Sequence, residues 1–117
     1  MMKIIRKLNL CFALLFLLIA NYGLSQTDSS AEILAKCSEY HSYVGNENLS
    51  IDFFERAITK AIESTSTEEE RASILYELGR QAGSVIGVLA SIEAYTTQEN
   101  AFQQAYMFIE EQCTNLQ

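Results

Sequence analysis

The residues best suited to chemistry in this 117-residue chain are one histidine and three cysteines, and their spacing builds no catalytic or metal centre. His41 lacks a second histidine four residues away, and no two cysteines stand two residues apart, so the common zinc patterns are missing. No serine stands in a Gly-x-Ser-x-Gly turn that would expose a nucleophile. Paired carboxylates such as Glu110 and Glu111 lie near predicted helix ends, where exposure keeps them ionised and unsuited to general acid catalysis. We therefore expect no enzyme activity, no cofactor and no metal.

An aromatic cluster is the first candidate for binding rather than catalysis. Tyr40, His41 and Tyr43 fall within one turn of a predicted helix, and together they could form a recognition patch. More often, such a cluster of rings is half-buried packing. His41, two residues from Glu39, is also the one side chain that would titrate in a mildly acidic environment.

The N-terminal segment predicts export. Lys3, Arg6 and Lys7 precede an uncharged apolar run of 11 residues, 10–20, and a short polar stretch follows. This is the layout of a secretory signal peptide, and a membrane-spanning helix would need roughly 20 apolar residues. We expect a signal peptide at 1–25, with Cys11 inside it, and a mature domain at 26–117. The mature chain should have no stable membrane span and should reside in the periplasm or outside the cell.

The predicted mature chain is strongly acidic. Loss of the signal peptide leaves five basic residues against fifteen acidic ones, a net charge of −10. Such a charge argues against binding to nucleic acid or to an anionic membrane. The charge either serves only to keep the protein soluble or attracts a partner with a basic surface.

Helix-start signals recur along the mature chain, which contains no proline. Ser29 with Glu32, and Thr67 with Glu70, form capping boxes, and Ser50 follows Leu49 as an expected N-cap. The start of the last helix is signalled by Thr96, Thr97 and Glu99. Apolar residues at three- and four-residue spacing follow each signal. The sequence therefore predicts an all-α, small four-helix bundle-like domain with helices near 30–44, 50–63, 68–95 and 97–114.

A disulfide between Cys37 and Cys113 is expected within this domain. Both cysteines lie on the apolar side of their helices, the first and the last, and exported proteins mature where disulfides persist. A mature chain of 92 residues has a limited core, so a crosslink would add useful stability. The alternatives are two buried thiols or pairing between chains.

The predicted helix 68–95 has two stripes. One is apolar, with three- and four-residue spacing, and consists of Leu75, Leu78, Ala82, Val85, Leu89 and Ile92. The other consists of Gly79, Gly83 and Gly87. Three glycines in one helix each cost roughly 1 kcal/mol relative to alanine, which is reasonable where another backbone approaches closely. We expect this helix to be central, with the glycine stripe packed against another helix of the chain. A homodimer face or a binding groove remains an alternative.

These features favour a binding protein of the periplasm or exterior, such as an inhibitor or immunity protein that blocks a toxin or enzyme through a helical face. The alternative is an acid-responsive envelope chaperone or a self-associating structural protein that uses the glycine stripe. The partner, an unknown protein or a second copy of the chain, is not indicated by any motif.

Overall fold

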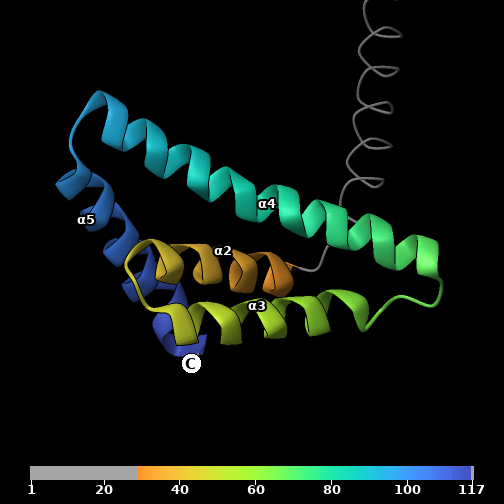
Figure 1. Cartoon of the computed structure of the whole chain (residues 1–117). Helices are drawn as coiled ribbons and strands as arrows, with labels where there is room; N and C mark the ends of the chain where they lie inside the picture. The colour runs from red at the N-terminus through yellow and green to blue at the C-terminus, as the bar shows by residue number, and fades with distance from the viewer. Residues whose placement is uncertain (1–28, 117) are drawn as a thin grey trace, which may run out of the picture.

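The computed structural model describes residues 29–116, and within this range the chain is helical (Figure 1). Four α-helices are followed by one π-helical turn and one short 3-10 turn. Their bounds are α2 Ser29–Tyr43, α3 Glu47–Ile62, α4 Glu68–Tyr95, α5 Gln98–Phe108, η1 Ile109–Cys113 and η2 Thr114–Leu116. The all-α prediction and its four helices are confirmed, with the last helix ending in the π turn instead of continuing to residue 114. The predicted signal peptide 1–25 lies outside the described residues.

Local side-chain chemistry sets the start of the last two α-helices. Thr67 and Thr97 have extended backbone angles, and each side chain accepts a hydrogen bond of 3.1 Å from the backbone N–H three residues on. Glu70 accepts in return from the backbone N–H of Ser66, at 3.0 Å. These bonds satisfy donors that a helix start leaves free, so α4 and α5 begin where the capping signals predicted.

The turn between α2 and α3 differs from the prediction. Gly45 has a positive φ of 88°, a conformation that favours glycine, and it ends α2. Helix α3 then begins at Glu47, three residues before the expected N-cap Ser50. Ser38 of α2 instead donates a hydrogen bond of 2.7 Å to the backbone oxygen of Ser50, which joins the two helices.

The short helix α2, not the long helix α4, is the central element. Figure 1 shows α2 between α3 and α4, and α2 packs against α3, α4, α5 and η1. Seven of the 15 residues of α2 are buried, against four of 28 in α4. The prediction that helix 68–95 is central is therefore wrong. It failed because the described helices pack against α4 on one side, where Leu78, Ala82, Val85 and Leu89 are buried.

Two clusters of buried residues hold the helices together. The larger one surrounds Phe53 and Leu78 where α2, α3 and α4 meet, and the smaller one surrounds Val85 and Leu89 where α4 meets α5. Alanines of α2, α3 and α5 lie fully buried in these clusters, so the helices approach closely. None of the described helices is long and apolar enough to cross a membrane.

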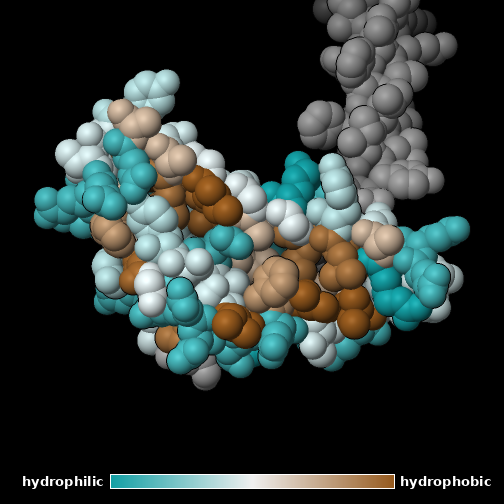
Figure 2. All heavy atoms as spheres, in the orientation of Figure 1, coloured by the Kyte–Doolittle hydropathy of each residue, from teal (hydrophilic) through white to brown (hydrophobic). Residues whose placement is uncertain are grey.

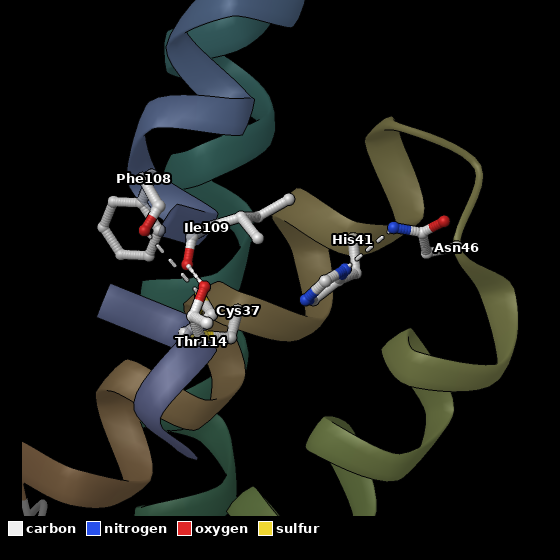
Figure 3. Close-up of a disulfide and its surroundings, with 7 residues drawn as sticks. Cys37, His41, Asn46, Phe108, Ile109 and Thr114 are labelled. Carbon is white, nitrogen blue, oxygen red and sulfur yellow. Dashed lines mark hydrogen bonds between the residues drawn. A yellow bond between two sulfur atoms is a disulfide. The ribbon is translucent and has the colours of Figure 1, made fainter. Parts of the chain in front are cut away.

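The predicted disulfide is confirmed. Cys37 of α2 and Cys113 of η1 are bonded, with their Cα atoms 5.7 Å apart, and both side chains are fully buried. That Cα separation lies within the usual range for disulfides. Figure 3 shows the bond where the C-terminal turns meet α2, with Thr114 donating a hydrogen bond to the backbone oxygen of Ile109 at 3.1 Å.

Candidate functional site

The predicted recognition patch is divided between the core and the surface of α2. Tyr40 is 8% exposed and stacks on Phe108, with ring centroids 4.1 Å apart. His41 is 2% exposed and stacks on Phe53 at 5.3 Å. Only Tyr43 is partly accessible. The three side chains therefore do not form one exposed patch, and two of them pack the core.

His41 is a buried polar group with one unsatisfied atom. Its Nδ1 lies 3.1 Å from the side-chain nitrogen of Asn46, and since an amide nitrogen donates, Nδ1 accepts (Figure 3). The proton of the neutral ring is then on Nε2, which has no hydrogen-bond partner among residues 29–116. Burial lowers the pKa of His41, so the folded chain favours the neutral ring.

Tyr43 links α2 to α4 through a hydrogen bond. Its hydroxyl donates to the carboxylate of Glu93, 50 residues further along the chain, and its ring packs against Phe102. Burial, followed by the hydrogen bond to Glu93 and the charge of that carboxylate, raises the pKa of Tyr43 to about 12. The phenol is therefore neutral at physiological pH and holds the Glu93 carboxylate in place.

The glycine stripe is exposed. Gly79, Gly83 and Gly87 all lie on the solvent side of α4, and a Cβ atom added to any of them would meet no atom within 4 Å. No other part of the described chain packs there, so the expectation that the stripe packs against another of the helices within residues 29–116 is wrong. The two alternatives, contact with a second copy or with another molecule, remain.

Large apolar side chains accompany these glycines on the same side of the helix. Tyr76 is 75% exposed and Ile86 is 57% exposed. At about 100° per residue, they project within the same sector as the glycines. We call this surface the outer face of α4, and it consists of Tyr76, Gly79, Gly83, Ile86, Gly87 and Ala90.

The outer face is uncharged over about 21 Å of helix, at 1.5 Å per residue. In the view of Figure 2, apolar side chains gather along the half of α4 nearer α5 and again where α4 crosses α2 and α3. The sequence pattern identified the glycine stripe but not the complete outer face. The positions of Tyr76 and Ile86 around the helix had not been compared with the position of its buried side. Their spacing of three and four residues from the glycines is the signal that would have revealed it.

A groove of about 280 Å³ borders the outer face, between α2 and α4. We call it the α2–α4 groove. Its lining residues are Glu39, Ser42 and Tyr43 from α2 and Ile86, Leu89, Ala90 and Glu93 from α4. Apolar atoms form most of its surface, and Ile86 and Ala90 belong to both the groove and the outer face.

A larger hollow of about 690 Å³ lies between α2 and α3 and includes Arg56 and Lys60. These cations are already paired, Arg56 with Asp52 at 3.7 Å and Lys60 with Glu63 at 3.6 Å. Its charges are thus balanced within the chain, and it lies on the far side of α2 from the groove. We therefore place the candidate site at the outer face of α4 and the α2–α4 groove.

The chemistry available at this site is contact and charge pairing. Across residues 29–116 there is no group of three histidine, cysteine or acidic side chains that could hold a metal ion. Hydroxyl, carboxylate and apolar groups line the groove, and its one phenol donates a hydrogen bond to Glu93. Comparisons with protein-family models, with curated proteins and with solved structures found no match to this chain.

Proposed function

We propose that this chain is an exported binding protein, an inhibitor or immunity protein, that holds a protein partner against the outer face of α4. The observation that carries the proposal is the exposure of Tyr76 and Ile86 beside three glycines that have open space above them. Aromatic side chains at the centre of an interface often supply much of its binding energy. Glycines beside them would allow the partner backbone to approach closely.

The energetic cost of the glycines in α4 supports a role for them in binding a partner rather than in folding. Each glycine in a helix interior costs roughly 1 kcal/mol relative to alanine. No contact within residues 29–116 offsets that cost, because the space above each glycine is open. A partner that packs on the stripe would offset it on binding.

Two features support an exported location. The signal-peptide layout of 1–25 precedes the helical domain, and the disulfide between Cys37 and Cys113 suits an oxidising compartment. The excess of acidic residues after position 25 favours a partner with a basic surface.

The proposal is tested by capture of the partner with matched variants. The exported, oxidised protein carries a C-terminal tag, is crosslinked in the envelope and culture fluid of its own source, and is read by mass spectrometry. One stoichiometric protein is expected with the native chain and with Ser84→Leu, which places a leucine on the same helix away from the outer face. Gly83→Leu should lose that partner while its melting temperature stays near that of Ser84→Leu.

Capture of the same protein at equal yield by both variants would contradict a role for the outer face. Recovery of many weakly bound proteins in place of one would contradict an inhibitor or immunity protein. The Ser84→Leu control is needed because any added leucine changes the hydrophobicity of α4, whereas only Gly83→Leu blocks the stripe.

The second candidate function, an acid-responsive chaperone or a self-associating structural protein, is favoured by the buried His41. A neutral histidine with an unpartnered Nε2 is positioned to loosen the packing of α2 on α3 when it gains a proton. Sedimentation at pH 7.5 and pH 5 distinguishes this candidate. It requires a dimer that depends on Gly83 at neutral pH and dissociates in acid, and a monomer at both pH values would exclude it.

A further inference from the structure

The α2–α4 groove combines an apolar floor with two carboxylates. Glu39, Ser42 and Tyr43 lie at i, i+3 and i+4 along α2, so they share one side of that helix. Residues Ile86, Leu89, Ala90 and Glu93 repeat the same spacing along α4. Two matching helix sides therefore enclose the groove, with aliphatic groups of α4 and the ring of Tyr43 inside it and one carboxylate supplied by each helix.

Neither carboxylate forms an ion pair with another described residue. The ion pairs among residues 29–116 involve Asp52, Glu63 and Glu77, and none includes Glu39 or Glu93. Lys36, one turn before Glu39 on α2, forms no ion pair with it. Burial raises the pKa of Glu39, which means that this carboxylate has lost part of its hydration without gaining a compensating charge.

A hydrogen bond orients the Glu93 carboxylate at the groove. One of its oxygens accepts the hydroxyl hydrogen of Tyr43, and this bond crosses from α4 to α2 at the groove. A carboxylate that is already oriented loses little side-chain entropy when it binds a ligand. Its other oxygen makes no hydrogen bond among the described residues and is available to a ligand.

We propose that the α2–α4 groove binds one arginine or lysine side chain of a basic protein partner. The aliphatic stem would lie against Ile86, Leu89 and Ala90, and the cationic end would pair with Glu39 and Glu93. Long basic side chains bury their stems on apolar surface while the charge stays at the rim. This inference rests on the proposed function, because it assigns the groove to the same partner that covers the outer face.

Other occupants fit the groove less well. An anionic group would be repelled by both carboxylates, and a purely apolar side chain would bury Glu39 further without a counter-charge. With about 280 Å³, the groove is slightly smaller than the pockets that enclose drug-sized ligands, yet it suits one extended side chain. Its continuity with the outer face through Ile86 and Ala90 places it where a partner on α4 would reach it.

The test is a titration that needs no knowledge of the partner. The oxidised protein, labelled with nitrogen-15, is titrated with an acetylated and amidated Gly-Ala-Arg-Ala-Gly peptide and followed by amide chemical shifts. Matched peptides carry lysine or norleucine in place of arginine, and norleucine keeps the stem but removes the charge. We expect saturable shifts near Tyr43, Ile86 and Ala90, with the norleucine peptide binding about tenfold more weakly.

Variants assign the binding to the two carboxylates. Glu39→Gln and Glu93→Gln should each weaken binding of the arginine peptide by about tenfold, while Glu110→Gln, which makes the same change of charge on η1, should leave it unchanged. Glutamine can still accept the hydrogen bond of Tyr43, so the fold is kept, and a thermal melt checks this. Equal weakening by Glu110→Gln, equal binding of norleucine, or shifts elsewhere on the chain would overturn the proposal.

The titration and the partner capture fail independently. Peptide binding that requires Glu39 and Glu93 supports the groove as a site for a basic side chain, even if no stoichiometric protein is captured. In that case only the proposed function is contradicted. The opposite result is that a partner is captured equally by the native chain, Glu39→Gln and Glu93→Gln, and that no peptide binds. This result overturns the proposal for the groove and leaves the proposed function standing.

Discussion

Reduction of the disulfide between Cys37 and Cys113 should remove a large share of the stability of this fold. The bond joins α2 to η1 across a sequence separation of 76 residues, almost the whole described domain. In the chain-entropy model, opening a loop of this length lowers the free energy of the unfolded chain by about 4.5 kcal/mol at 25 °C. Small domains are stable by about 5–15 kcal/mol in total. The reduced protein should therefore be close to its unfolding limit in water.

The loss of unfolding free energy is measured by urea unfolding of the same protein, either oxidised or reduced with a phosphine. Using one sequence avoids the cavity that replacing two fully buried cysteines would create. With a denaturant slope of about 1.5 kcal/mol per M, a loss of about 4.5 kcal/mol lowers the urea midpoint by about 3 M. The control is the double variant Cys37→Ala with Cys113→Ala, whose midpoint should not respond to the reductant.

Two results would refute this reasoning. A reduced protein with an unchanged urea midpoint would show that the crosslink does not constrain the unfolded chain as argued. Two alkylatable thiols in the exported, unreduced and unfolded protein would show that the bond does not form there. Intact mass supplies the matching positive result, a gain of two hydrogens on reduction.

Three further predictions follow from single residues. Because burial lowers the pKa of His41, its neutral form stabilises the fold above the unfolded value near pH 6.5, and this stability is lost as the pH falls through the folded pKa. Urea midpoints should drop between pH 7 and pH 5 in the native protein and drop less in His41→Leu; equal drops would be evidence against this role. Thr67→Ala removes the N-cap bond of α4 and should lower the free energy of unfolding by about 1 kcal/mol, measured by urea unfolding, whereas an unchanged value would argue that the cap contributes nothing. Gly83→Ala meets no atom within 4 Å and should raise the free energy of unfolding by up to about 1 kcal/mol, so a lower melting temperature would contradict the open stripe.

The features that the sequence predicted correctly are those that neighbouring residues determine. Thr67 and Thr97 cap their helices through bonds to residues three positions away, so the signal and its outcome lie within one turn. Ser50 carries a similar signal, yet its backbone oxygen accepts a hydrogen bond from Ser38 of α2 and the helix starts earlier. That outcome depends on how α2 packs against α3, which no local pattern contains.

The buried side of α4 was also predictable, but its surroundings were not. Leu78, Ala82, Val85 and Leu89 are buried as their spacing indicated, while Leu75 at the start of the same stripe is 39% exposed. Periodicity identifies the side of a helix that faces the core. It does not tell how many helices cover the other sides, and no helix within residues 29–116 covers the glycine side of α4.

Two outcomes at the candidate site have one physical origin. Tyr40 and His41 of α2, for which the sequence left both a recognition patch and packing open, are in the core, and glycines of α4 that were expected to pack within the chain are at the surface. Both follow from the disulfide and the turn at Gly45, which bring η1 and α3 onto α2 and make this short helix the one that is surrounded. Once α2 is enclosed, α4 can contact the rest of the chain along one side only. The long helix is thereby left with an uncharged outer face, and the line where it meets α2 becomes a groove whose two carboxylates, Glu39 and Glu93, lie 54 positions apart in the sequence and are brought together only by the fold.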